Sequence, residues 1–267
     1  MTLPNRQSLL LLNLLNIYFS MRPLSAAELL QVWDNGTGMS LLEKTLLLLG
    51  KACATEDWKQ LGKLSIGNRD AKLLQLREWM FGNKLRNMTK CPACSEMVEW
   101  ETNTEALRLQ PVKEDISVET FSLRQGKFNI HFRLPDSYDV LKFSTEGNQS
   151  PYIKQLLTEC IIDITGADNE KYAPDVLPAI AWQTLEESMS KKDPQADITM
   201  QIICPYCQHN WNAVFDIMSF LWTEINNWAK HVMQEVALLA RAFSWSEKDI
   251  LAMTPQRRRL YIEMIYQ

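Results

Sequence analysis

The chain has 267 residues, 46% hydrophobic and 22% charged, so it can bury a substantial core in one large domain or two modest ones. Its formal charge of -4 gives no general attraction to phosphate backbones or anionic membranes, so nucleic acid is disfavoured as a partner. No run of about 18 uncharged apolar residues occurs, so no membrane-spanning helix is predicted.

The first apolar run, RQSLLLLNLLNIYF, follows directly on the N-terminal residues. Asn13 and Asn16 interrupt it and no small-residue cleavage site follows, which favours a buried first helix over a signal peptide. Two helices are then predicted by capping boxes, Ser25 with Glu28 and Ser40 with Glu43.

A third helix is predicted in SIGNRDAKLLQLREWMFG. Leu73, Leu76 and either Trp79 or Met80 fall on one face at helical spacing, and Gly82 can end the helix. The first ninety residues therefore indicate a helical segment.

Six cysteines occur, and four of them form the pairs CPAC and CPYC: Cys91, Cys94, Cys204 and Cys207. This spacing is typical of thiolate ligands rather than of disulfides, and it implies a reducing, cytoplasmic environment. The remaining two, Cys53 and Cys160, lie on helical patterns and are expected in the core.

A strand pattern follows each cysteine pair. Val98 and Trp100 alternate with polar residues after the first pair, and Trp211 and Ala213 do so after the second. DITMQII, before the second pair, is also strand-like. The second pair is therefore predicted to lie in a tight turn, or knuckle, between two strands. This is the plan of a zinc ribbon.

More than a hundred residues separate the two pairs, far beyond the roughly 15 to 20 of a compact ribbon. We therefore expect an inserted subdomain of mixed α and β structure. TFSLRQGKFNIHFRL predicts two strands joined at RQGK, whereas PYIKQLLTECIID and DVLPAIAWQTLEESM predict helices.

A long amphipathic helix is predicted after the second ribbon half. Its apolar stripe consists of Leu221, Ile225, Trp228, Val232, Val236, Leu239 and Phe243. Two short helices then follow, capped by Ser246 and by Thr254 with Pro255 at its first position.

The predicted fold is α+β and predominantly helical, with a ribbon interrupted by an insertion. The expected divisions are a helical segment at 1–89, ribbon halves at 90–107 and 198–216, an inserted α+β subdomain at 108–197, and a C-terminal helical segment at 217–267.

Four thiolates leave no open coordination position, which describes one structural Zn²⁺ rather than a catalytic ion. CPYC also occurs in glutaredoxins, where the pair opens a helix that lowers the thiol pKa, but a strand pattern follows it here. A thiol-disulfide oxidoreductase is thus a weaker alternative. His209 is interpreted as a turn residue or an outer hydrogen-bond donor rather than a ligand.

No catalytic triad, HExxH motif or phosphate-binding glycine loop is present, so neither catalysis nor a small-molecule substrate is predicted. Arg257, Arg258 and Arg259 fan around their helix, which favours a solvated face or an acidic protein partner. The second class of function is a zinc-ribbon nucleic-acid-binding or regulatory protein, which the net charge disfavours.

Two stretches carry a family resemblance: SIGNRDAKLLQLREWMFGNKL running into KCPACSEMVEWE, and ITMQIICPYCQHNWNAVFDIMSFLWTEINNWA running into AFSWSEKDILAMTPQRRRLYIEMI. Over residues 60–267 the chain resembles the baseplate hub assembly proteins, or hub chaperones, of T-even phages and contractile injection systems. The resemblance implies a small cytoplasmic or particle-associated protein that helps to build a baseplate or hub by binding other tail proteins.

The mechanism expected from this resemblance is non-enzymatic. A zinc-pinned core would fix helical arms whose apolar surfaces cover unassembled tail components. The candidate partner-binding residues are Trp222, Trp228, Phe243, Trp245 and Tyr261.

Overall fold

The computed structural model describes residues 21–113, 117–143, 149–166 and 170–266. Helices predominate over small antiparallel sheets, as predicted for an α+β fold. The helices are α2 (Ala26–Asn35), α3 (Leu41–Ala52), α4 (Ile66–Phe81), α5 (Thr104–Leu107), α6 (Ser137–Phe143), α7 (Gln149–Cys160), α8 (Ala179–Lys192), α9 (Ile217–Phe243), α10 (Glu247–Leu251) and α11 (Pro255–Ile265), with 3-10 turns η1 (Trp58–Lys63), η2 (Pro174–Val176) and η3 (Pro194–Ala196). The strands are β1 (Lys84–Lys90), β2 (Met97–Asn103), β3 (Thr120–Gln125), β4 (Phe128–Arg133), β5 (Ile161–Thr165), β6 (Thr199–Ile203) and β7 (Asn210–Val214).

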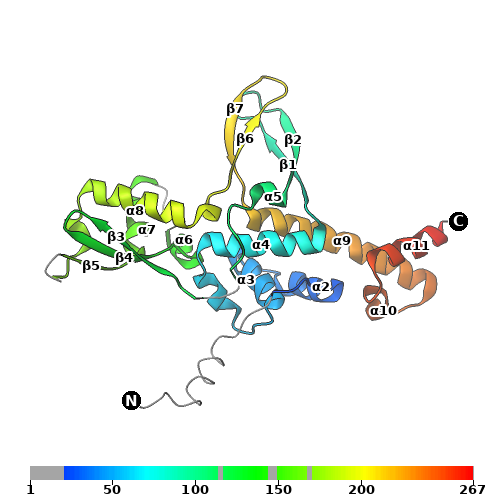
Figure 1. The fold of residues 1–267 in the computed structure, drawn as a ribbon. Helices are drawn as coiled ribbons and strands as arrows, with labels where there is room; N and C mark the ends of the chain where they lie inside the picture. Colours follow the sequence, from blue (N-terminus) through cyan, green and yellow to red (C-terminus); the bar gives the residue numbers. More distant parts are fainter. Residues whose placement is uncertain (1–20, 114–116, 144–148, 167–169, 267) are drawn as a thin grey trace, which may run out of the picture.

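Helices α2, α3 and α4 pack with the first half of α9 into a helical body (Figure 1). Both predicted capping boxes are confirmed, because Ser25 and Ser40 each accept a backbone hydrogen bond while Glu28 and Glu43 reach back to the cap. Gly82 ends α4 with φ of 85°, a conformation that a residue with a Cβ rarely adopts.

The core of the body is aliphatic. It is built mainly from Leu29, Val32, Leu46, Leu49, Leu61, Leu73, Leu76, Leu221 and Ile225. On α4 the predicted face is confirmed, and it continues through Met80, which packs against this core, whereas Trp79 is exposed. The spacing of leucines thus sets how α4 and α9 lie together.

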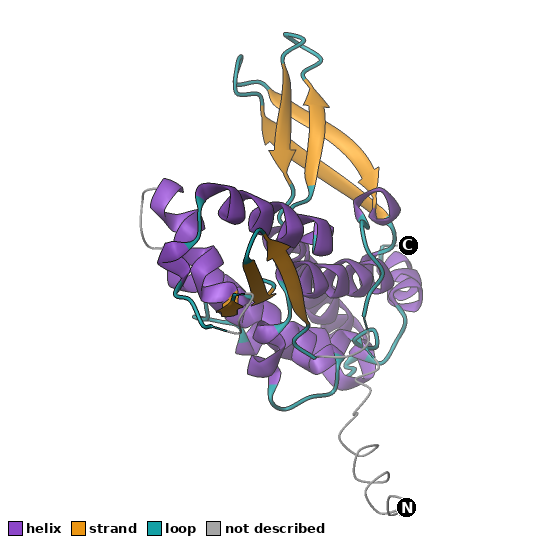
Figure 2. Cartoon of the chain, turned by 60° about the vertical axis from the view of Figure 1, so that its left-hand side comes forward, coloured by secondary structure: helices purple, strands orange, loops and turns teal. Residues whose placement is uncertain are grey.

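The two hairpins β1–β2 and β6–β7 project together from the helical body, as Figures 1 and 2 show. Each is an antiparallel two-stranded sheet, and the cysteine pairs lie in its turn. The predicted strands after both pairs, and the strand before the second pair, are confirmed.

Strand β1 lies within the range expected to be helical, so that expectation is wrong at its C-terminal end. The inward face of β1 carries Leu85, Asn87 and Thr89, two of them polar, so no apolar alternation marks the strand. Pairing with β2 along its whole length, from Lys84 opposite Asn103 onward, overrides this weak local signal.

The residues between the ribbon halves form a lobe of mixed α and β structure at the left of Figure 1. Its sheet has the order β3-β4-β5, and α8 packs against β3. The predicted β3–β4 hairpin is confirmed, with Gly126 at φ of 59° in its turn. A separate core holds it together, including Ile130, Phe132, Leu157, Ile164 and Leu185.

One helix prediction in this lobe is too long. PYIKQLLTECIID was expected to be helical throughout, but α7 ends at Cys160 and Ile161–Thr165 form β5. Of the residues IID, Ile161 lies opposite Phe132 and Asp163 opposite His131 in β4, with a register shift between the two pairs. The apolar residues keep helical spacing across this boundary in the sequence. Long-range pairing with β4 therefore determines where α7 ends and β5 begins.

Helix α9 runs from the base of the ribbon to the C-terminal helices at the right of Figure 1. Its predicted stripe faces inward at Leu221, Ile225, Val232 and Leu239, which are buried, whereas Phe243 is exposed. The predicted caps of α10 and α11 are confirmed at Ser246 and Thr254.

The first apolar run, predicted as a buried helix, lies outside the described residues. Among the helices of the described ranges, none combines the length and the apolar character needed to cross a membrane.

Candidate metal centre

The first cysteine pair lies in the turn that joins β1 to β2. The N–H of Cys91 donates to the carbonyl of Glu96 at 2.9 Å, and the N–H of Ser95 donates to the carbonyl of Cys91 at 2.9 Å. Ser95 has φ of 63°, so the chain reverses just after the second cysteine, Cys94. This turn directs both thiols of the pair to the same point.

The second pair repeats this arrangement between β6 and β7. The N–H of Cys204 donates to the carbonyl of His209 at 2.9 Å, the N–H of Gln208 donates to Cys204 at 3.0 Å, and Gln208 has φ of 61°. Two segments far apart in the sequence therefore form the same knuckle. The pair leads into a strand rather than a helix, so no helix dipole acts on Cys207.

The two knuckles face one another and bring the four thiols together. The sulfur of Cys91 lies 3.7 Å from that of Cys207, and the sulfur of Cys94 lies 3.7 Å from that of Cys204. All four sulfurs lie within 4.8 Å of one another. A tetrahedral thiolate site with metal–sulfur bonds of about 2.3 Å has sulfur–sulfur edges of about 3.8 Å. The cluster can therefore hold one metal ion with all four positions filled by protein.

The thiols differ in how readily they ionise. Although burial opposes ionisation, hydrogen bonds from the Cys94 and Ala93 amides and from neighbouring thiols lower the pKa of Cys91 to about 7. The Glu96 amide favours the Cys94 thiolate, but desolvation and the three adjacent thiols outweigh it and raise the pKa of Cys94 to about 12. Four thiolates so close together need a cation to balance their charge.

A small apolar cluster supports the knuckles from inside the ribbon. Val98 and Ile202 are buried, and Trp100, Trp211 and Ala213 pack against them. This core is far smaller than the cores of the helical body and the inserted lobe. Burial alone therefore holds the two hairpins together weakly, and a bound ion would be a major link between them.

Comparison with known proteins adds one finding. A family model described as T4 bacteriophage base plate protein matches residues 24–222, which is most of the chain. The chain belongs to this family. The match begins and ends earlier than the resemblance noted in the sequence, so α9 beyond Trp222, α10 and α11 lie outside it. No curated protein and no solved structure matches the chain.

Among the described residues, no histidine side chain of this base plate family member belongs to the cluster of four sulfurs. His209 is exposed, stacks on Trp211 with ring centroids 6.0 Å apart, and contributes its carbonyl to the knuckle turn. His131 lies 3.7 Å from Asp163, and His231 lies 3.2 Å from Glu235. The structure therefore places His209 in the turn, as the sequence indicates.

The other two cysteines are buried in separate cores, as predicted. Cys53 lies in the helical body, where burial raises the pKa of its thiol. Burial also raises the pKa of Cys160, to about 12, despite the nearby Arg133. Both thiols are therefore protonated and unreactive at neutral pH.

The five candidate partner-binding residues divide into two groups. Trp222 and Trp228 are half-buried and pack against the core of the body. Phe243, Trp245 and Tyr261 form an aromatic cluster between the end of α9 and α11, with Phe243 and Trp245 stacked at 4.6 Å and Trp245 edge-on to Tyr261 at 4.8 Å. The fold thus brings only the last three together.

The arginine run on α11 corrects one expectation. Arg257 lies over the ring of Tyr261 and Arg259 is exposed, so the three arginines do fan around the helix. Arg258 is buried, however, and its guanidinium donates to Glu235 on α9 at 2.7 Å and to the carbonyl of Met253 at 2.9 Å. Arg258 therefore links α11 to α9, so the three arginines do not form an entirely solvated face.

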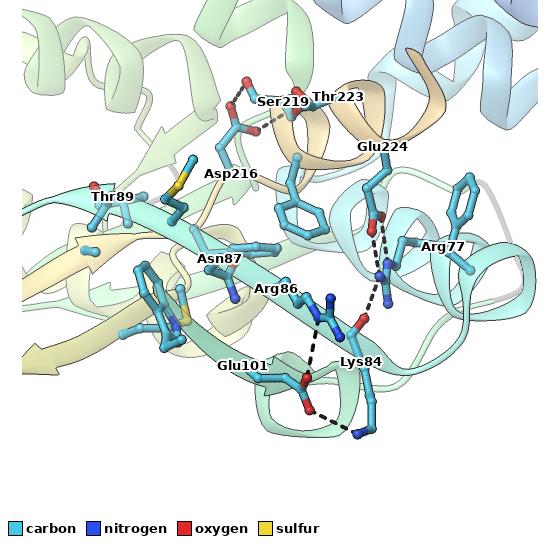
Figure 3. Close-up of a pocket in the computed structure, with 18 of the residues that line it drawn as sticks. Arg77, Lys84, Arg86, Asn87, Thr89, Glu101, Asp216, Ser219, Thr223 and Glu224 are labelled. Atoms are coloured by element: carbon cyan, nitrogen blue, oxygen red, sulfur yellow. Dashed lines mark hydrogen bonds and ion pairs between the residues drawn. The ribbon is translucent and has the colours of Figure 1, made fainter. Parts of the chain in front are cut away.

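A groove of about 810 Å³ at the base of the ribbon was not predicted from the sequence. Figure 3 shows it between β1, which carries Arg86 and Asn87, and the first turns of α9, which carry Asp216 and Glu224. Four separate chain segments line it, so no local motif marks it. The alternation of Lys84, Arg86 and Met88 in β1 is its only sequence signal.

Proposed function

We propose that this chain is a non-enzymatic assembly factor, a chaperone or component of the baseplate hub in a phage tail-like contractile injection system. Membership of the T4 base plate protein family supports a baseplate-associated structural role. The chain would act in the cytoplasm or on the assembling particle, and its partners would be other baseplate or tail proteins.

The observation that carries the proposal is the convergence of four thiols on one point. Cys91, Cys94, Cys204 and Cys207 would hold one structural Zn²⁺, because their edge lengths match a tetrahedral thiolate site. When bound, the ion would supply a cross-link rather than reactivity, since the four thiolates leave no position open for a substrate.

The proposed division of the chain follows from this site. The ribbon halves at 90–107 and 198–216 would close around the ion on either side of the insert at 108–197, and the helical segments at 1–89 and 217–267 would flank them. The ribbon would then fix where α9 leaves the body, since Asp216 caps α9 two residues after β7 ends.

The partner-binding surface is proposed on the C-terminal arm, defined as α10, α11 and the end of α9. Phe243 is exposed beside Trp245 and Tyr261, and Leu260 and Met264 add exposed apolar area on α11. Clustered aromatic residues are typical of binding hot spots. Trp222 and Trp228 would support this arm from the core rather than touch a partner.

The experiment is complementation of particle assembly. A host that lacks this chain but produces the other tail proteins should form few intact particles, and the wild-type chain should restore them. The variant Cys204→Ser with Cys207→Ser should fail to restore them, whereas Cys53→Ser, outside the cluster, should succeed. Full assembly without the chain would overturn the proposed function.

A further inference from the structure

A free strand edge lies along the groove at the base of the ribbon. Strand β1 pairs only with β2 in the described part of the chain. The bonds from Cys91 to Glu96 and from Thr104 to Asn83 show which residues of β1 face β2, because bonded residues alternate along an antiparallel pair. The N–H and C=O groups of Arg86 and Met88 therefore point away from β2.

The N-terminal end of this strand edge is held rigidly. Arg77 is buried and donates to the carbonyls of Gly82 at 2.6 Å and Lys84 at 2.7 Å, and it forms an ion pair with Glu224 of α9 at 2.7 Å. These contacts fix the start of β1 relative to α9. The edge is thus available in a fixed position, which lowers the entropy cost of binding.

The groove beneath the edge is largely apolar. Its lining includes Phe81, Trp100, Met200, Phe215 and Phe220. In an added strand, alternate side chains would point toward this floor while the others faced outward. Strand addition therefore suits the groove better than a ligand that contacts the floor alone.

The charges along the edge select the occupant. The outward side chains of β1 include Lys84, Arg86 and Lys90. Glu101 on β2 pairs with the first two, and Glu99 lies opposite Met88, so three cations face two acids on this side of the hairpin. The other two acids of the groove are engaged, Glu224 with Arg77 and Asp216 with the N-terminus of α9. A second copy of β1 would place cations opposite cations, which destabilises a strand pair.

We infer that the free edge of β1 binds an extended, acidic segment of a partner protein by strand addition. The backbone of Arg86 and Met88 supplies the hydrogen bonds, the cations of β1 select carboxylates, and apolar side chains of the segment enter the groove. This surface is separate from the C-terminal arm and does not depend on it.

The test uses two fluorescent eight-residue probe peptides and the full-length wild-type chain. One peptide alternates valine with glutamate and the other alternates valine with lysine. Fluorescence anisotropy should show at least tenfold tighter binding of the acidic peptide. Hydrogen exchange should show new protection of the Arg86 and Met88 amides. Equal binding of both peptides, or no binding, would overturn the inference.

Matched variants separate the contribution of backbone hydrogen bonds to peptide binding from the contribution of charge. Met88→Pro removes an edge donor and should weaken acidic-peptide binding at least tenfold, whereas Glu99→Pro removes the equivalent donor from the opposite edge of the hairpin and should not. Arg86→Glu should weaken binding similarly, whereas Arg124→Glu, at an exposed position of β3, should leave it unchanged. Metal content is measured on each variant to confirm that the ribbon is intact.

Two results would contradict the inference in different ways. Unchanged binding by Met88→Pro with an intact ribbon would exclude strand addition and leave a small-molecule or helical ligand for the groove. A wild-type dimer in sedimentation that Met88→Pro dissociates would mean that a second copy occupies the edge. Neither result bears on the metal centre or on particle assembly.

Discussion

Arg77 joins α4, the start of β1 and α9 through one buried guanidinium, which is 2% exposed. Arg77→Met would leave Glu224 and two carbonyls without their donor. Since breaking a buried charged network typically costs 3–5 kcal/mol, we expect about 3 kcal/mol of lost stability in urea unfolding. Arg86→Met, at an exposed position, should change stability by less than about 0.5 kcal/mol. Equal stabilities of the two variants would refute this role for Arg77.

Glu28 closes the N-terminus of α2 and gives a prediction for pH. Hydrogen bonds from Arg22 and then Ser25 lower its pKa from 4.5 to about 2, against the opposing effect of burial. Because the folded pKa lies below the unfolded one, its contribution is full above about pH 4.5 and is lost as pH falls through about 2.

The corresponding measurement compares urea midpoints of the wild type and Glu28→Gln between pH 6 and pH 2.5. The wild type should be more stable at pH 6, and the difference should shrink as the pH falls. A difference that stays constant over this range would show that the carboxylate charge of Glu28 does not contribute.

Residue-level features were predictable wherever their cause is local. Ser25 with Glu28, Ser40 with Glu43, and Gly82 act through backbone groups within four positions, so their signals survive in the sequence. The burial of Arg258 was not predictable in this way, because its partner Glu235 lies on another helix.

Among the elements, the C-terminal arm carries the proposed contact surface. Trp245→Ala with Tyr261→Ala removes two of the three rings of the aromatic cluster without opening the cores of the body or the insert. We expect at least a tenfold loss of intact particles in the complementation assay, with folding and metal content retained. Trp79→Ala on α4 is a matched control, because Trp79 is also an exposed tryptophan but lies away from the arm. Equal particle yields would exclude the arm as the contact.

Among the secondary-structure elements, the long helix α9 was predictable from the sequence, whereas strands β1 and β5 were not. Seven apolar residues at helical spacing determine α9 almost independently of context. Asn87 and Thr89 face inward on β1, and β5 follows α7 without a break residue, so pairing with β2 and β4 decides both strands.

The described residues form four hydrophobic clusters, one of them inside the ribbon, and this arrangement predicts how metal removal acts. The ribbon cluster around Val98 and Ile202 is small, and it is distinct from the leucine core of the body. Chelation under reducing conditions should therefore speed hydrogen exchange in residues 84–103 and 199–214, while α3 and α4 stay protected. Loss of protection in α3 and α4 at the same chelator concentration would contradict independent cores.

The meeting of distant cysteine pairs was predictable at the scale of the molecule because tetrahedral metal chemistry demands four ligands and each pair supplies two. The groove was not, because it exists only where α4, α9 and the four strands of the ribbon come together. The repeated cysteine pairs reveal the metal site from the sequence alone. The groove is lined by four separate segments of the chain, so it can be identified only from the folded structure.

The most direct test of this account is the zinc content per chain, by native mass spectrometry on protein purified under reducing conditions. One zinc per wild-type chain, and none in Cys204→Ser with Cys207→Ser, is the predicted result. A metal-free wild-type chain with a reducible Cys204–Cys207 disulfide would contradict it and favour separate redox-active pairs.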